Sequence, residues 1–358
     1  MNDQAHIEQA DLGRCSRGLA AGATTTQADS PIINGGVSTR WACREANRQS
    51  SFIPAHRVAR SPLAVFLPVF HASGMNAPAR EEICRAVRFA LSEDVGSGDV
   101  TSLSTVPEGA QARAKMVARE MLLVCGLSLA EEAFRQVDSN LSIHRQAKDG
   151  QRVDRGDILL TVEGPARAIL TAERVALNFV QRLSGIATTT AQFVEAIRGT
   201  HAKILDTRKT TPGLRLLEKY AVVCGGGQNH RIGLFDMVLI KDNHLVALQN
   251  EPPNAIDAAV KRARERYPHL KVEVEADTPQ QVEQALFAGA DVILLDNMTL
   301  EEMKTAVHWV NKRAKTEASG GVRLGTVRAI AETGVDYISI GALTHSARSV
   351  DIALDFEG

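Results

Sequence analysis

The feature that most constrains the fold of this chain is the regular alternation of short apolar segments with helical segments along its C-terminal half. Segments such as AIDAAVKRARERY and TPQQVEQALFAGA have helical patterns, and they separate apolar segments of strand length. This alternation is typical of β-α units, whose strands form a parallel sheet. The segments that predict strands are residues 202–206, 237–241, 270–275, 291–296, 313–317 and 337–341. We therefore predict an α/β barrel of about six parallel strands, which is fewer than the eight of a complete barrel.

A small α+β domain is predicted before the barrel. It has strand patterns at residues 112–118, 141–147 and 157–164 around a helix at 128–137, and a long helical stretch leads from it into the barrel. The predicted boundaries are residues 75–185 for the α+β domain and 186–345 for the barrel, with the C-terminal segment 346–358 as a candidate addition to the first domain.

The first 74 residues have a different character from the rest. They are rich in Gly, Ser, Thr and Ala, and they show no sustained helical or strand period, so we interpret residues 1–74 as a disordered extension. Acidic residues in this stretch, such as Asp3 and Asp29, argue against an organelle transit peptide. We interpret Met75 as the start of the folded protein.

Composition excludes several classes of partner. A formal net charge of −1 gives no overall attraction to nucleic acid or to an anionic membrane. The longest apolar run near the N-terminus, residues 63–70, is far shorter than the roughly 20 residues needed to span a bilayer. The five cysteines are widely spaced, without zinc-finger or redox-motif spacing, which favours a reducing compartment. We predict a cytoplasmic protein with no membrane or nucleic-acid partner.

Charged residues follow the predicted barrel strands. In α/β barrels the loops at the carboxyl ends of the strands form the mouth and carry the reactive groups. Five candidates fall at such ends: Arg208 and Lys209 follow the first strand, and Lys241, Glu275 and Asp296 are the last residues of the second, third and fourth. A single loop charge is usually solvated, but convergence at one mouth indicates a site for anionic ligands.

Two acidic residues share one face of the third predicted barrel strand, since Glu273 and Glu275 are two positions apart. We interpret Glu273 as a structural ion-pair partner of Lys241 or Arg208. Glu275 and Asp296 lie nearer the mouth, where carboxylates can hold Mg²⁺ through water or stabilise a developing cation.

The segment after the first barrel strand contains a histidine with three possible roles. His230 could be a catalytic acid, a zinc ligand or a hydrogen-bond donor to an anion. Its neighbours Asn229 and Arg231 favour the third role, and further zinc ligands at suitable spacing are not evident.

Glycines follow the last two predicted strands, at Ser319-Gly320-Gly321 and at Gly341. Their backbone N–H groups can approach a phosphate closely, as in the phosphate sites of many barrels.

Taken together and in order, the motifs from residue 79 to the C-terminus resemble those of the quinolinate phosphoribosyltransferase family. The motifs are LSEDVGSGDVT, AERVALNFVQRLSGIAT, DTRKTTPGLR, GGGQNHR, LIKDNH, EVEAD, ILLDN, EASGG and ETGVDYISIGALTHS. The resemblance implies an N-terminal α+β sandwich domain, an incomplete α/β barrel, and a homodimer in which each N-terminal domain caps the partner's barrel, with a hexamer as the alternative. Two features depart from the family pattern: the first 74 residues, and Thr316 at a position that is usually apolar.

The resemblance also implies a reaction and a role for each motif residue. Quinolinate and phosphoribosyl pyrophosphate would give nicotinate mononucleotide, pyrophosphate and CO₂, with Mg²⁺ and no organic cofactor, in NAD biosynthesis. The catalytic residues would be Lys209, Glu275 and Asp296, and Glu275 and Asp296 would face the ribose and hold Mg²⁺ mostly through water or pyrophosphate. The substrate-binding residues would be Arg208, His230, Arg231 and Lys241 for the dicarboxylate and neighbouring phosphates, Arg174 for the quinolinate of the partner subunit, Lys209 for phosphoribosyl pyrophosphate, and Ser319, Gly320 and Gly341 for the 5′-phosphate, with His345 nearby.

Two other functions remain open on the sequence alone. A related type II phosphoribosyltransferase, or a homologue associated with molybdenum transport, would share the scaffold but act on another substrate. A non-catalytic phosphate-binding regulator would explain the glycines, but it would leave Glu275 and Asp296 without a role.

Overall fold

The computed structural model describes residues 77–357. The prediction of a disordered extension at residues 1–74 therefore lies outside the described residues. Within the described part of the chain, no helix has both the length and the apolar character needed to cross a bilayer.

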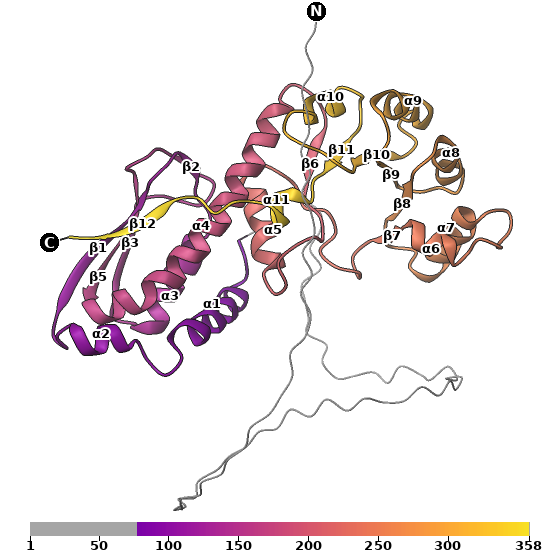
Figure 1. Ribbon diagram of the computed structural model, residues 1–358. Coiled ribbons are helices and arrows are strands. Elements are labelled where there is room, and N and C mark those ends of the chain that lie inside the picture. Colours follow the sequence, from indigo (N-terminus) through magenta and orange to yellow (C-terminus); the bar gives the residue numbers. More distant parts are fainter. Residues whose placement is uncertain (1–76, 358) are drawn as a thin grey trace, which may run out of the picture. The chain divides into compact units, whose positions relative to one another are not determined.

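The first domain contains a four-stranded antiparallel sheet in the order β12-β1-β5-β3. Its strands are β1 (Gln111–Ala118), β3 (Ser142–Arg145), β5 (Ile158–Pro165) and β12 (Ile352–Phe356), and β2 (Leu122–Leu123) and β4 (Arg152–Val153) form a separate pair. Its helices are α1 (Arg80–Val95), α2 (Val100–Thr105) and α3 (Leu127–Val137). Figure 1 shows β12, the yellow C-terminal strand, beside β1 in this sheet. Chain segments more than 200 residues apart are thus hydrogen-bonded neighbours, since Met116 pairs with Leu354.

A long helix, α4 (Ala166–Ala196), belongs to the cores of both domains. It packs against α3 and β1 of the first domain and against α5 (Arg215–Cys224) of the second. Its buried face includes Gly185, where an added Cβ would overlap the backbone carbonyl oxygen of Arg348. A glycine therefore lets the segment before β12 lie directly on the helix.

The second domain is an open six-stranded parallel sheet in the order β6-β11-β10-β9-β8-β7. The strands are β6 (Lys203–Leu205), β7 (Val238–Ile240), β8 (Val272–Ala276), β9 (Val292–Asp296), β10 (Lys315–Ser319) and β11 (Tyr337–Ser339). Strands β6 and β7 lie at the two ends of this order, so the barrel is not closed. The predicted incomplete barrel of about six parallel strands is confirmed.

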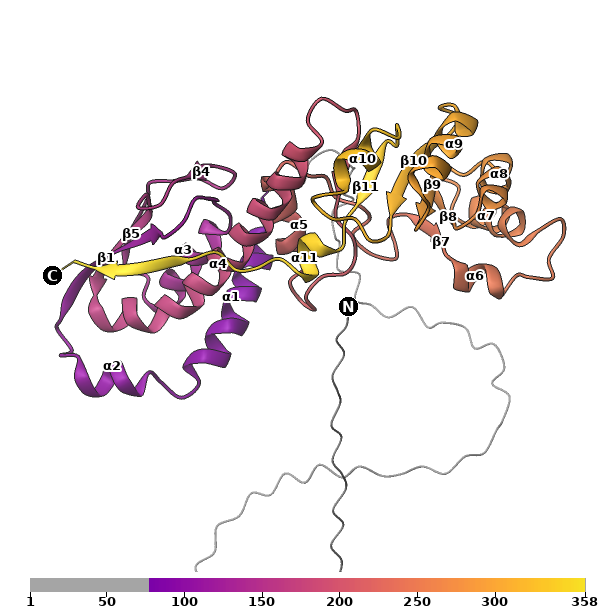
Figure 2. The same cartoon turned by 45° about the horizontal axis from the view of Figure 1, so that its top comes forward.

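Helices follow the strands, and four of them pack against the sheet: α7 (Ala255–Arg266), α8 (Pro279–Phe287), α9 (Leu300–Val310) and α10 (Val327–Ala331). Two short helices, α6 (Asp242–Val246) and α11 (Ala342–His345), follow β7 and β11 and contact other helices. Figure 2 shows α7, α8 and α9 outside the strands that they contact. Helices α8 and α9 begin with capping boxes, at Thr278 and Thr299. The side chains of Gln281 and Glu302 accept hydrogen bonds from the backbone N–H groups of these cap residues. These caps stop each loop a few residues after its strand, which limits the freedom of the residues at the mouth.

Thr316 is accommodated in the core by a local hydrogen-bond network. Its side chain is buried on β10, and both its Oγ1 and its backbone N–H donate to Asp336 Oδ2, at 3.2 and 3.0 Å. A buried hydroxyl with such partners costs little, so the strand keeps its register next to β9.

Candidate active site

The carboxyl ends of the barrel strands bring most of the predicted site residues together. Arg208 and Lys209 follow β6, Lys241 follows β7, Glu275 lies near the end of β8, and Asp296 ends β9. Ser319 ends β10 and is in register with Asp296, while Gly341 follows β11. The prediction that reactive groups gather at one end of the sheet agrees with this arrangement.

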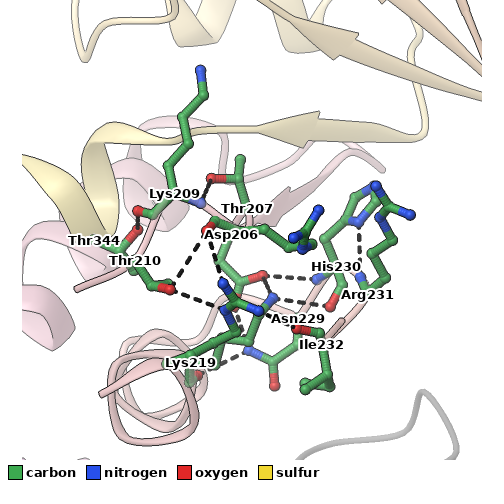
Figure 3. Close-up of polar contacts among 12 residues, drawn as sticks. Asp206, Thr207, Lys209, Thr210, Lys219, Asn229, His230, Arg231, Ile232 and Thr344 are labelled. Carbon is green, nitrogen blue, oxygen red and sulfur yellow. Dashed lines mark hydrogen bonds and ion pairs between the residues drawn. The ribbon is translucent and has the colours of Figure 1, made fainter. Parts of the chain in front are cut away.

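A buried carboxylate anchors the segment that carries the cationic residues. Asp206 accepts hydrogen bonds from the backbone N–H of His230, at 2.9 Å, and from Asn229 Nδ2, at 2.5 Å, and it forms an ion pair with Lys219 of α5 (Figure 3). Both members of the ion pair are fully buried. Burial raises the pKa of Asp206 and lowers the pKa of Lys219, although each charge favours the other.

Two arginines, Arg208 and Arg231, follow the two segments that this anchor joins, and their positive charges act on each other. Burial lowers the pKa of Arg231, and the positive charge of Arg208 lowers it further. Arg231 donates to the carbonyl oxygen of Met237 at 3.2 Å, whereas Arg208 Nε is buried and has no hydrogen-bond partner in the described chain. Two guanidinium groups that repel each other, one with a free buried donor, form a site that an anion would stabilise.

Gly341 lies close to Lys209 and His345, where the β6 loop meets α11. A Cβ on Gly341 would lie 3.0 Å from Lys209 Cδ and 3.1 Å from His345 Nε2. The loop is tied to α11 because Thr344 Oγ1 donates to the carbonyl oxygen of Lys209 at 2.7 Å. In Figure 3 the Lys209 side chain extends away from the Asp206 network, which leaves its ammonium group available to a ligand.

Carboxylates gather where β8 and β9 end. Glu275, Asp277 and Asp296 each place an oxygen within 4.8 Å of the others. Carboxylate oxygens are the ligands that Mg²⁺ prefers, so this group fits a magnesium ion. Lys241 forms an ion pair with Glu275 and keeps 43% of its side chain exposed. A lysine ammonium at the end of an apolar strand needs an anionic partner, and Glu275 is that partner for Lys241.

The loop after β10 is shaped by glycine. Gly320 has a φ of +94°, and a Cβ at this position would overlap Asn297 Oδ1 and lie 2.7 Å from Asn297 Cγ. Asn297 donates from Nδ2 to Asp296 Oδ2 at 2.7 Å, and its backbone N–H donates to the carbonyl oxygen of Ser319 at 3.1 Å. The glycine lets the backbone after β10 approach the acidic cluster closely.

His230 lies inside the barrel between two buried carboxylates. Its Nε2 is 3.0 Å from Glu273 Oε2 and 3.6 Å from Glu317 Oε2. Burial lowers the pKa of His230 but the two carboxylates raise it, with a net rise. Its Nδ1 accepts the backbone N–H of Arg231 at 2.8 Å, which opposes this rise because an imidazolium has no lone pair at Nδ1.

We therefore assign the tautomer of His230 that carries its proton on Nε2. His230, Glu273 and Glu317 bring possible metal-ligand atoms within 4.8 Å of one another, but a protonated Nε2 cannot bind a metal. Both ring nitrogens of His230 have protein neighbours, so its role as a donor to an anion stays a prediction.

The predicted ion pair of Glu273 with Lys241 or Arg208 is wrong. Glu273 faces His230, and Lys241 pairs with Glu275 instead. The register between the strands gives the reason: Leu239 of β7 pairs with Glu273, so Lys241, two residues further, reaches the level of Glu275. Both acidic side chains share a face, but only the second lies at the height of the lysine.

Arg174 lies on α4, outside the group of residues at the mouth. Its side chain is 59% exposed, and among the described residues its acidic neighbour is Glu173, at 4.0 Å. Its predicted role, at the quinolinate of a partner subunit, stays a prediction.

Comparison with known proteins agrees with the geometry of the mouth. The model of the quinolinate phosphoribosyl transferase N-terminal domain matches residues 99–184, and that of the C-terminal domain matches residues 186–355. The chain belongs to the quinolinate phosphoribosyltransferase family. The family predicted from the sequence motifs is confirmed.

Individual relatives cover most of both chains. A Bacillus subtilis (strain 168) protein named probable nicotinate-nucleotide pyrophosphorylase (carboxylating) is 45% identical over 264 residues, which are 74% of this chain and 89% of the relative. A rice (Oryza sativa subsp. japonica) protein named nicotinate-nucleotide pyrophosphorylase (carboxylating), chloroplastic, is 46% identical over 287 residues and covers 76% of each chain. The solved structure of the nicotinate-nucleotide pyrophosphorylase from Francisella tularensis superposes with a TM-score of 0.75 at 39% identity, over 80% of this chain and all of that one.

Several polar residues of this quinolinate phosphoribosyltransferase family member were not predicted from the sequence as parts of the site. They are Asp206, Lys219, Asp277, Asn297 and Glu317. Asp277 could have been found, because it lies two residues after the third predicted strand. Lys219 could not, because a lysine within a helical segment is usually a solvated surface charge.

Proposed function

We propose that this protein transfers the phosphoribosyl group of phosphoribosyl pyrophosphate to quinolinate and releases pyrophosphate and CO₂. The product, nicotinate mononucleotide, would enter de novo NAD biosynthesis. The observation that carries the proposal is the buried and unpartnered Arg208 Nε, beside a second arginine, Arg231, whose pKa the charge of Arg208 lowers, at the end of the barrel that also gathers acidic oxygens. Curated relatives at 42–46% identity carry names for this activity.

The two arginines would bind the carboxylates of quinolinate. A guanidinium offers a planar pair of N–H groups that matches a carboxylate bidentately, whereas a lysine supplies a single charge. Binding a dianion would relieve the repulsion between Arg208 and Arg231 and would satisfy Arg208 Nε. Lys241 would contribute a further positive charge at the same mouth, with its ammonium held by Glu275.

The acidic cluster and the glycine loops would bind the phosphoribosyl donor. Glu275, Asp277 and Asp296 would hold Mg²⁺, which supplies charge neutralisation to the departing pyrophosphate when it is bound. The carboxylates of Glu275 and Asp296 also favour positive charge on the ribose ring as the anomeric bond breaks. Ser319, Gly320 and Gly341 would cradle the 5′-phosphate. Lys209 would add positive charge beside Gly341, and His345 lies next to the same glycine.

Decarboxylation requires no organic cofactor in this proposal. Once the ring nitrogen of quinolinate is glycosylated, it carries a positive charge that stabilises the carbanion left at the adjacent carbon when CO₂ departs. This carbon then takes a proton from water, which gives nicotinate mononucleotide. The arginines hold the carboxylates in a fixed orientation, and enclosure of both reactants at one mouth makes their reaction effectively intramolecular.

A homodimer would complete the site in this proposal, with a hexamer as the alternative assembly. Arg174 of one subunit would add a cation to the quinolinate site of the other, which fits its exposure on α4 and its absence from the cluster at the mouth. The location is proposed to be cytoplasmic.

The proposal is tested by incubating the protein with phosphoribosyl pyrophosphate and Mg²⁺, with quinolinate in one sample and nicotinate in another, and separating the products. We expect nicotinate mononucleotide in the sample with quinolinate and no product in the sample with nicotinate. A product from nicotinate, but not from quinolinate, would show a related phosphoribosyltransferase with another substrate. Binding of phosphoribosyl pyrophosphate without any product would favour a phosphate-binding regulator.

A further inference from the structure

The Asp206–Lys219 ion pair is the one fully buried pair among the ion pairs of residues 77–357, since the side chains of both partners have 0% exposure. It joins Asp206, directly after β6, to Lys219 of α5, the helix that packs against α4 and α11. Removing two charges from water costs several kcal/mol for each ion, and their attraction often no more than offsets that cost. The stability of the fold alone is therefore a weak explanation for this pair.

Both main-chain polar groups of His230 form hydrogen bonds with this ion pair. Its N–H donates to Asp206 Oδ1 at 2.9 Å, and its carbonyl oxygen accepts from Lys219 Nζ at 3.0 Å (Figure 3). The preceding residue is held as well, because Asn229 Nδ2 donates to Asp206 Oδ2 and to the carbonyl oxygen of Lys219. The conformation of residues 229–230 is thus set by two side chains that come from other parts of the sequence.

The pair also connects the two segments that carry the arginines. Asp206 is two residues before Arg208, and His230 is one residue before Arg231. The backbone N–H of Asp206 donates to the carbonyl oxygen of Gln228 at 3.2 Å, so the two segments are already hydrogen-bonded beside the pair. A change in the pair would move both guanidinium groups relative to each other.

We propose that the buried Asp206–Lys219 ion pair positions Arg208 and Arg231, so that their guanidinium groups together fit a dicarboxylate. Asp206 and Lys219 are positioning residues that do not touch the substrate. The inference rests on the proposed function for the identity of the dicarboxylate, quinolinate. The arrangement of the segment at residues 228–231 does not depend on that identity.

The variants for the test separate positioning from stability. Lys219→Met leaves the Asp206 carboxylate buried without its partner and should lower the melting temperature sharply. The double variant Asp206→Asn/Lys219→Met removes both charges and should recover much of the lost melting temperature. It still lacks the donor to the carbonyl oxygen of His230. Lys315→Met is the control for the loss of a lysine ion pair far from the mouth, since Lys315 pairs with Asp336 where β10 begins, at the opposite end of the strand.

The first measurement is steady-state kinetics. In the double variant we expect the KM for quinolinate to rise at least tenfold and the KM for phosphoribosyl pyrophosphate to change less than threefold. The control should change neither constant. Recovery of both the melting temperature and the quinolinate KM in the double variant would overturn the proposal, because the pair would then serve stability alone. An equal rise in both KM values would also overturn it.

The second measurement is amide hydrogen exchange, which needs no substrate. We expect the amides of residues 229–231 to exchange at least tenfold faster in the double variant, while the amides of β8 and β9 keep their rates. Unchanged exchange at residues 229–231 would contradict the proposal even if the wild-type protein used another substrate. A wild-type protein that does not turn over quinolinate, but shows this local effect, would refute the proposed function and leave the positioning role standing.

Discussion

Asp206 and Arg208 are two residues apart, and their surroundings differ completely. The carboxylate of Asp206 is buried and has three hydrogen-bond donors, whereas Arg208 Nε is buried without an acceptor in the described chain. An unmade hydrogen bond to a buried group costs about 1–3 kcal/mol. At the scale of single residues, this contrast identifies Arg208 as a group prepared for a ligand and Asp206 as part of its support.

The first prediction concerns Arg208→Ala. We expect the KM for quinolinate to rise about 10- to 100-fold, because a hydrogen bond to a charged group contributes about 1.5–3 kcal/mol. The melting temperature should change little, since Arg208 side-chain contacts are not part of the core. Arg198→Ala, at a highly exposed site on the barrel surface, is the control. Equal KM values in the two variants would remove Arg208 from the site.

The second prediction concerns pH and Glu317. Burial and the nearby Glu273 raise the pKa of Glu317 to about 8 in the folded protein, from an ordinary value of 4.5. Between these values the folded protein holds a proton that the unfolded chain releases, so this group makes the free energy of unfolding fall as pH rises from about 4.5 to about 8.

The variant Glu317→Gln has no such proton to lose. Its melting temperature relative to wild type should therefore increase steadily between pH 5 and pH 8 and level off above that. Thermal unfolding at several pH values in this range measures the difference. A difference that does not depend on pH would show that Glu317 titrates normally in the fold.

The residues of the site were predictable where charge follows an apolar strand, as with Lys241 and Asp296. Buried partners were not predictable in this way. Glu317 lies inside a strand with the pattern KTEAS, and spacing alone does not tell whether its side chain points into the barrel. The partner of Glu273 depends on the register between β7 and β8, which the sequence of one strand does not contain.

At the scale of elements, the site depends on short strands that end in tightly held turns. Strands β6, β7 and β11 each have three residues, so the residues that follow them are held mainly by loop contacts. Thr344 holds the β6 loop, Asp206 holds the segment before Arg231, and Asn297 packs against the loop after β10. The mouth is thus a set of loops fixed by side-chain hydrogen bonds.

The third prediction concerns the loop after β10. Gly320→Ala should destabilise the protein by about 1–3 kcal/mol, because an L-residue is strained at positive φ and the new methyl group overlaps Asn297. The KM for phosphoribosyl pyrophosphate should rise more than the KM for quinolinate. Gly325→Ala is a matched control, since its Cβ would meet no atom within 4 Å and its φ is not positive. If the two variants behaved alike, the close approach of Gly320 to Asn297 would have no function.

The elements themselves were largely predictable from periodicity. The predicted strands at residues 270–275 and 291–296 correspond to β8 and β9. Both strands are buried on both faces and are apolar except for their acidic residues. The prediction at 313–317 was displaced from β10, Lys315–Ser319, because the polar sequence KTEAS gives a weak apolar signal. The short pair β2 and β4 was missed, since two residues carry no period.

At the scale of the whole molecule, the chain returns to the first domain after it completes the barrel. Strand β12 extends the sheet at β1, and Ile352 is buried in the core. Arg119 forms an ion pair with Asp355 across the two strands. The sequence indicated a tail that could join the first domain, but its partner strand is set by long-range packing against α4 and β1, which periodicity cannot reveal.

The fourth prediction concerns this return. A chain that ends at Asp351 lacks β12, exposes the edge of β1 and loses the burial of Ile352, which alone contributes about 1.5–3 kcal/mol. We expect a lower melting temperature and a tendency to aggregate, measured by thermal unfolding and light scattering. A chain that ends at Phe356 is the control, because it keeps β12 and loses the surface ion pairs of Glu357 and one backbone hydrogen bond, from the Glu357 N–H to the carbonyl oxygen of Arg113. Equal stability of the two chains would show that β12 is not part of the folded core.

The most direct test of the whole account follows the carboxylate that lies next to the ring nitrogen of quinolinate. The carbon of this group is labelled, and released CO₂ and pyrophosphate are measured in the same reaction with phosphoribosyl pyrophosphate and Mg²⁺. We expect one labelled CO₂ for each pyrophosphate, and neither product when nicotinate replaces quinolinate. Pyrophosphate release without labelled CO₂, or turnover of nicotinate in place of quinolinate, would contradict the central claim that this mouth binds a dicarboxylate and decarboxylates it.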